Sequence, residues 1–269
     1  MLSCAQEKEL TIRTSFYENS KEFLLSDDPD LLDMLDYVLT LEYPVSIMSS
    51  DGNNYPELCE QIQRDILERI FGEEATEAAY NGKLAKDPMV REHEDAFVSR
   101  SKNLVLDRNE KIKKEYLQLF GLRDKNSKTF KSLGHKVYLH EVVCFLAYHY
   151  KDIISYHIHW NINQYGKAHS YERGYNYALD GQLISENDFF TEEGITEILP
   201  QLLTEEFERY PMTAKIPHFQ TQITPNGNFK LSPKGIIYMY DAGEIADTQH
   251  GILRITLPWD KVEEIIKLS

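Results

Sequence analysis

The sequence is poor in cysteine, in long apolar runs and in positive charge, and each shortage excludes a class of protein. Three cysteines among 269 residues, an odd number, argue against a disulfide framework. No run of about 18 apolar residues occurs, so we expect no membrane-spanning helix. The 13 glycines and 10 prolines are too few for a collagen-like or disordered chain. The 29 lysines and arginines against 44 aspartates and glutamates give a formal charge of −15, which predicts repulsion of nucleic-acid phosphates and anionic lipid.

The apolar and aromatic content of the chain suffices for a substantial hydrophobic core. Hydrophobic residues make up 42% of the chain and aromatic residues 12%. A chain of 31.4 kDa can bury roughly three-quarters of its surface on folding. The length therefore allows one large domain or two small ones.

Hydrophobic periodicity predicts a mixture of strands and helices. Alternation or continuous apolar character predicts strands over 10–17, 37–47, 136–148, 155–163, 170–178, 229–231, 236–240 and 251–257. Three- and four-residue spacing predicts helices over 56–71, about 89–120, 191–210 and 259–268. Pro200 lies inside the third helix, so we expect a kink or two short helices there. The predicted fold class is α+β, an antiparallel or mixed sheet packed by helices in two sequential subregions.

The strand over 155–163 alternates strictly, which predicts one packed face and one polar face. Its apolar side chains are Tyr156, Ile158, Trp160 and Ile162. The polar side chains are Ser155, His157, His159, Asn161 and Asn163, and we expect Tyr171, Arg173 and Tyr175 of the next strand beside them. Such a mixture of aromatic and hydrogen-bonding groups is typical of a solvated sheet and also of a site for a glycan or a protein.

The histidines of this region raise the question of a metal site. His157 and His159 point the same way from one strand and His169 begins the next, so three imidazoles could converge on a zinc-sized site. However, no Asp or Glu is spaced to orient the rings, and polar faces of antiparallel strands routinely carry histidine. We therefore predict no metal ion and no cofactor.

Two further motifs have simpler interpretations than catalysis. The segment from His140 to Cys144 resembles a metalloprotease motif with Cys for the second His, but that chemistry needs a helix and this segment has strand composition. Glu244 lies in a turn, where we expect its carboxylate to cap backbone amides. Cys59 and Cys144 lie in apolar patterns and are expected to pack as small hydrophobes.

Two segments resemble a known family. The motifs are Gly166-Lys-Ala-His169, Asp180-Gly181 and Asp188-Phe-Phe190 in the first segment, and Glu244-Ile-Ala246 with Leu257-Pro-Trp259 in the second. They are similar to the PdaC-like extracytoplasmic domain and to the companion domain of unknown function that follows it. This pair forms the non-catalytic extracytoplasmic part of peptidoglycan deacetylases and of the anti-sigma factor RsiV. Many other members are stand-alone lipoproteins without an assigned activity, and the resemblance implies this form here.

The resemblance implies an N-terminal linker and first strand over 1–20, a PdaC-like domain over 21–180 and a C-terminal domain over 181–269. It implies binding rather than catalysis, because the deacetylase domain with its metal-binding Asp and paired His is not found in this sequence. Lysozyme is the ligand best known for the family. The chain departs from the family pattern at Lys167, Ser170, Gly243 and Thr248. These departures put the corresponding ligand contacts of the family in doubt.

The segment Leu2-Ser3-Cys4 is similar to the end of a bacterial lipoprotein signal, in which a small residue precedes the lipidated cysteine. The alternative is a cytosolic protein with a chance cysteine near its start. We expect a lipid anchor on Cys4 and a location in the periplasm or at the outer surface.

Together these observations predict a non-catalytic binding module of the cell envelope, with a cationic lysozyme-like protein or a peptidoglycan-related glycan as its partner. The alternative is a metal-dependent hydrolase that acts on cell-wall material through the histidine-rich strands. The expected ligand-binding residues are His157, His159, Asn161, His169, Tyr171 and Arg173.

Overall fold

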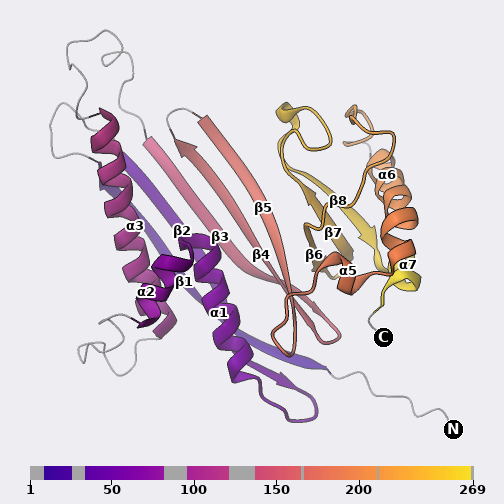
Figure 1. Ribbon diagram of the computed structural model, residues 1–269, viewed down its shortest axis with the longest axis horizontal. Helices are drawn as coiled ribbons and strands as arrows, with labels where there is room; N and C mark the ends of the chain where they lie inside the picture. The colour runs from indigo at the N-terminus through magenta and orange to yellow at the C-terminus, as the bar shows by residue number, and fades with distance from the viewer. Residues whose placement is uncertain are drawn as a thin grey trace.

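The chain folds into a five-stranded sheet and a three-stranded sheet, each packed against helices (Figure 1). The computed structural model describes residues 9–25, 34–81, 96–120, 137–164, 167–210 and 212–267. The α+β class with two sequential subregions is confirmed. The exact domain limits at residues 20 and 180 stay a prediction.

The larger sheet has the strand order β1-β2-β3-β4-β5. Its strands are β1 (Leu10–Leu24), β2 (Met34–Ser49), β3 (Val137–Tyr150), β4 (Ile153–Gln164) and β5 (Lys167–Ala178). The pair β2–β3 is parallel and the other pairs are antiparallel, so the sheet is mixed. The first strand is longer than the predicted range of 10–17 because it stays paired with β2 as far as Leu24.

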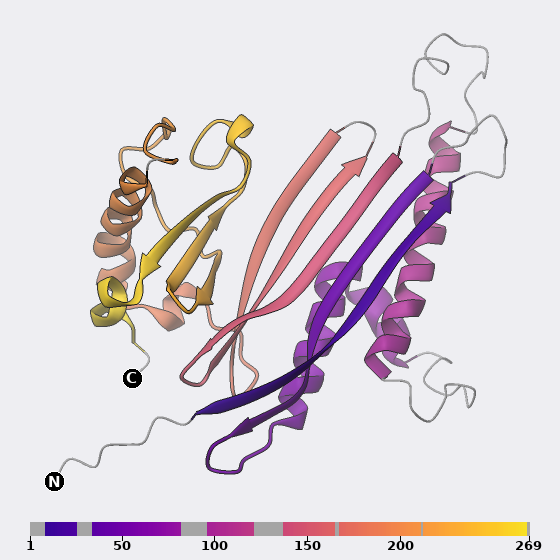
Figure 2. The same ribbon diagram turned by 180° about the vertical axis from the view of Figure 1, so that it is seen from behind.

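Helices α1 (Pro56–Phe71), α2 (Glu73–Asn81) and α3 (Ala96–Phe120) cover one face of this sheet (Figure 2). The limits predicted for α1 are confirmed, since Pro56 opens the helix and Gly72 ends it with a φ of 93°. The short helix α2 was not predicted from the sequence. Of the helix predicted over about 89–120, residues 89–95 lie outside the described residues and the remainder is α3.

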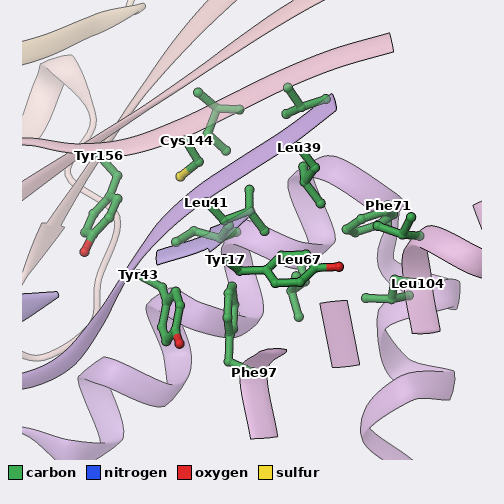
Figure 3. Close-up of a cluster of buried hydrophobic side chains, with 14 of the residues drawn as sticks. Tyr17, Leu39, Leu41, Tyr43, Leu67, Phe71, Phe97, Leu104, Cys144 and Tyr156 are labelled. Atoms are coloured by element: carbon green, nitrogen blue, oxygen red, sulfur yellow. The ribbon is translucent and has the colours of Figure 1, made fainter. Parts of the chain in front are cut away.

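The first core lies between the sheet and these helices (Figure 3). Leu39 and Leu41 of β2 are fully buried, as alternation along the strand predicts. The ring of Tyr43 stacks on that of Phe97 with 4.1 Å between the centroids. Because β2 presents every second side chain to the helices, the opposite face of the sheet is left for other contacts.

The smaller sheet, with the strand order β6-β7-β8, builds a second core. Its strands are β6 (Phe229–Ser232), β7 (Gly235–Tyr240) and β8 (Leu253–Pro258), and its helical segments are α5 (Glu186–Phe189), the π-helix η2 (Gly194–Ile198), α6 (Leu199–Arg209), the 3-10 turn η3 (Thr248–His250), α7 (Trp259–Val262) and the 3-10 turn η4 (Glu263–Ile265). The interruption expected at Pro200 is confirmed, because α6 begins beside this proline after a π-helix. The closing helix predicted over 259–268 is too long, since α7 continues as the 3-10 turn η4 and Ile266 is extended and forms a β-bridge with Phe190. Residue 268 lies outside the described residues.

Strand β6 joins the two sheets because it packs on β3, β4 and β5. The Asn176 amide donates to the Phe229 carbonyl oxygen at 3.1 Å, and the Leu231 N–H donates to the Ser155 hydroxyl at 3.0 Å. Gly174 permits this approach, because a Cβ there would overlap the Phe229 carbonyl. Within the described segments, no helix is both long and apolar enough to cross a membrane.

Candidate functional site

The register of β4 and β5 divides the expected ligand-binding residues between two faces of the sheet. His159 lies opposite Glu172 and Asn161 lies opposite Ser170, on the face away from the helices. The other candidates of β5 pair with the apolar side chains of β4 and so face the helices: His169 opposite Ile162, Tyr171 opposite Trp160 and Arg173 opposite Ile158. The expectation of one shared polar face is therefore wrong.

At the beginning of β4, the polar face of the strand is also less exposed to solvent than expected. Ser155 and His157 are buried, with 0% and 3% of their surfaces exposed, because β6 covers them. His159 is partly exposed, and Asn161 accepts a hydrogen bond from Ser170 at 3.2 Å and donates one to Glu141 at 3.2 Å. Only the second half of this face is available to solvent or to a ligand.

A buried carboxylate lies between the two sheets, which the sequence did not predict. Glu172 is only 3% exposed, and its Oε1 lies 2.9 Å from Nδ1 of His159. Arg254 of β8 donates its Nε–H to Oε2 at 2.8 Å and a second N–H to Oε1. His157 Nε2 lies 3.4 Å from Oε2. We call Glu172, His157, His159, Lys230 and Arg254 the Glu172 cluster.

These neighbours decide the ionisation of Glu172. Burial raises the pKa of its carboxyl, but the rings of His157 and His159 and the Arg254 guanidinium lower it more, so the net pKa is well below the ordinary value. Burial lowers the pKa of His157, and Lys230 lowers it further, while Glu172 opposes both effects. The cluster thus holds an ionised carboxylate beside a neutral, buried imidazole.

The structure overturns the premise that no acidic residue orients the histidine rings, because Glu172 does so. It also keeps His169 from His157 and His159, since His169 pairs with Ile162 on the opposite face. In the part of the chain that the structure describes, no three His, Cys, Asp or Glu side chains are grouped so that they could hold a metal ion.

Three of the predicted residues line a cavity of about 450 Å³ beside β5, which we call the β5 cleft. Its lining consists of Ala168, His169, Ser170, Tyr171, Arg173, Asp241 and Ala242. Tyr171 stacks on Trp160 with 4.7 Å between the centroids. Arg173 donates two hydrogen bonds to Asp241, at 2.9 and 2.6 Å. In Figures 1 and 2 the two sheets approach each other at the end of β5 and diverge toward its beginning. The residues of β5 that line the cleft belong to the first half of this strand.

The loop after β7 that closes the cleft is held by Glu244. Its Oε2 accepts the Asp241 N–H at 2.8 Å and its Oε1 accepts a hydrogen bond from Asn226 at 2.8 Å. The prediction that Glu244 caps the backbone is confirmed. The loop turns at Gly243, whose φ is 86°.

The remaining motifs have structural roles in the described residues. His140 and Cys144 lie in strand β3, which confirms that they do not form a metalloprotease helix. Cys59 and Cys144 are buried free thiols, as expected. Cys4 lies outside the described residues.

Sequence reasoning missed Asp241, Glu172 and Arg254 because their contacts depend on how the strands pair and how the sheets pack, and not on neighbours in the sequence. Asp241 and Arg254 lie 68 and 82 positions from the residues they contact. For Glu172, the available signal was an acidic side chain between Tyr171 and Arg173, which alternation places on the opposite face from both. Only the register of the β4–β5 hairpin brings this carboxylate to His159.

Residues 187–260 match the family model "Protein of unknown function (DUF3298)". A solved structure of a DUF3298 family member from Bacteroides fragilis NCTC 9343 has 17% identity and a TM-score of 0.65, and the match covers 95% of this chain and 93% of that one. A DUF3298 family protein from Pseudomonas aeruginosa PAO1 has 11% identity, a TM-score of 0.49 and 95% coverage of both chains. No curated protein matches. The first of these structures shows that the fold is shared.

Proposed function

We propose that this protein is a non-catalytic binding module of the cell envelope and that the β5 cleft receives its partner. The observation that carries the proposal is the cleft itself, a cavity of about 450 Å³ with His169, Tyr171 and Arg173 in its wall. These residues are among those expected to bind a ligand from the sequence. A concave site with a few convergent polar and aromatic groups is the usual form of a binding site.

The side chains of the cleft suit recognition better than bond cleavage. Arg173 and Asp241 form a two-point ion pair, so each already has its counter-charge. The Tyr171 ring is held in place by Trp160 and offers an aromatic surface of the kind that sugars and protein side chains contact. A fixed ring loses little conformational entropy when a partner binds to it.

The overall charge supports a cationic partner. A formal charge of −15 accelerates encounter with a positively charged protein such as lysozyme. The DUF3298 match over 187–260 supports a C-terminal domain of unknown function. We propose the stand-alone lipoprotein form, anchored through Cys4. Labelling of the expressed protein with a palmitate analogue tests this anchor, and retention of the label in Cys4→Ser would exclude it.

Binding can be tested by blocking the cleft. Ala242 is exposed in its wall, so Ala242→Trp fills the cavity without disturbing a core. We expect Ala242→Trp and Tyr171→Ala to weaken binding of lysozyme or of soluble peptidoglycan fragments at least about tenfold, measured by calorimetry. The matched control is Ala214→Trp, an exposed alanine beyond α6, which should bind like the wild type.

Two results would contradict the proposal. Equal affinity in the wild type, Ala242→Trp and Tyr171→Ala would exclude the cleft as the binding site. Stoichiometric metal in the purified protein, lost in the double variant His157→Ala and His159→Ala, would favour the alternative hydrolase.

A further inference from the structure

The Glu172 cluster connects the two sheets and is distinct from the β5 cleft. Glu172 belongs to β5, His157 and His159 to β4, Lys230 to β6 and Arg254 to β8. One carboxylate therefore faces four basic side chains at the junction of the two subregions. Because the cluster has one acidic and four basic side chains, each proton added to it increases the positive charge at a buried junction.

Both oxygens of the carboxylate already accept hydrogen bonds from charged or polar side chains. Oε2 accepts from Nε of Arg254 at 2.8 Å, and Oε1 contacts both the Arg254 guanidinium and His159. His157 Nε2 lies 3.4 Å from Glu172 Oε2, and neither ring nitrogen forms a hydrogen bond with a described residue. The His157 ring packs edge-on against the Phe145 ring with 4.7 Å between the centroids. Lys230 Nζ lies 5.4 Å from the centroid of the Phe145 ring. A proton on His157 thus enters a buried site whose negative charge is already compensated.

We propose that this cluster is a pH-sensitive latch, which holds the three-stranded sheet on the five-stranded sheet at neutral pH and loosens when His157 takes up a proton. The groups that surround His157 are His159 on its own strand, Phe145 on β3, Glu172 on β5, Lys230 on β6 and Arg254 on β8. Only one of them is negative.

The direction of the pH effect follows from the histidine. Because burial lowers the pKa of His157 in the folded protein, the unfolded or undocked chain binds the proton more readily. Docking is therefore strongest above the ordinary histidine value of 6.5 and weakens as the pH falls below it. Glu172 stays ionised in this range, because its own pKa lies well below its ordinary value of 4.5.

The latch also bears on the β5 cleft, and this part of the inference rests on the proposed function. Arg173, in the wall of the cleft, follows Glu172 directly and donates to the Glu172 carbonyl oxygen at 2.6 Å. The Asn228 amide donates to the same oxygen at 2.9 Å. Loosening of the cluster therefore changes the separation of β5 from the loop that carries Asp241.

Hydrogen exchange of the whole protein, followed by mass spectrometry and corrected for the chemical exchange rate, tests the latch without any ligand. We expect peptides from β6 to β8 to exchange several-fold faster at about pH 5 than at about pH 7.5, and this acceleration to be several-fold larger in the wild type than in His157→Gln. Peptides from α1 and β2 should respond to pH equally in the two proteins. The control His149→Gln changes a partly buried histidine at the end of β3, outside the Glu172 cluster and the β5 cleft, and should behave like the wild type.

Equal protection of β6 to β8 at both pH values in the wild type would overturn the proposal. If His157→Gln fails to fold, an NMR titration of the wild-type ring replaces it, and protonation of His157 at or above the ordinary value would overturn the latch. Lysozyme binding measured at about pH 7.5 tests the cleft alone, so failure of the proposed function and failure of the latch give different results.

Discussion

At the scale of single residues, His140 shows how burial decides protonation. Its ring stacks on Tyr37 with 6.2 Å between the centroids, and its Nε2 is buried without a hydrogen-bond partner among the described residues. Burial, assisted by Arg108, lowers the pKa of His140 from 6.5 to about 4. The neutral ring is thus part of the first core.

This lowered pKa predicts acid destabilisation. The unfolded chain takes up a proton near pH 6.5 and the folded chain only near pH 4, so stability is complete above 6.5 and falls between these values. We expect the wild type to lose about 2–3 kcal/mol more than His140→Phe between about pH 7 and pH 4.5, measured by urea unfolding. His169→Phe, at an exposed position, serves as control. Parallel pH profiles of the wild type and His140→Phe would refute this explanation.

Gly174 is the second residue whose role is steric. A Cβ at this position would overlap the carbonyl of Phe229, which is backbone and has nowhere to move. We expect Gly174→Ala to lower the free energy of unfolding by about 1–3 kcal/mol through displacement of β6. Thermal unfolding measures this loss, and Ser170→Ala on the same strand is the control. A variant as stable as the wild type would show that β6 does not approach β5 so closely.

At the scale of elements, the short strand β6 depends on one side chain for its position. Asn228 accepts from the Gly174 N–H at 3.1 Å and donates to the carbonyl oxygens of Glu172 at 2.9 Å and Met239 at 3.0 Å. It therefore ties β5 to β7 where β6 begins. Asparagine can serve both strands because its amide has a donor end and an acceptor end.

Removal of this amide should leave the Gly174 N–H without its partner and take one of two donors from each of the carbonyl oxygens of Glu172 and Met239. We expect Asn228→Ala to cost about 1–3 kcal/mol of unfolding free energy, measured in urea. Asn187→Ala, at an exposed position of α5, is the matched control and should change the stability little. If both variants unfold at the same urea concentration, Asn228 does not hold the junction.

The elements themselves were predicted well where the signal is local. Helix α1 has apolar residues at three- and four-residue spacing and a proline at its start, and both limits were correct. The closing helix was too long in the prediction, because Lys267 and Ile266 pair with the backbone of Phe189 and Phe190, far away in the sequence. Periodicity cannot report such a partner.

At the scale of the whole molecule, the formal charge of −15 creates a long-range negative field that a charged partner would meet. If the partner is cationic, the association rate constant for lysozyme should fall about tenfold or more when salt is raised from about 0.05 to about 0.5 M, because ions screen the long-range attraction. The dissociation rate should change less. Stopped-flow measurements distinguish the two rates, and a salt-independent association rate would contradict electrostatic steering.

The sequence by itself determined the α+β class, the alternation of β4, the limits of α1 and the capping role of Glu244. All of these depend on residues close together in the chain, because period and turn chemistry are local properties. Only the tertiary structure decided which histidines share a face, that β6 buries Ser155 and His157, and that Arg173 meets Asp241. These outcomes depend on strand register and on the docking of two sheets, in which side chains far apart in the sequence compete for the same buried space.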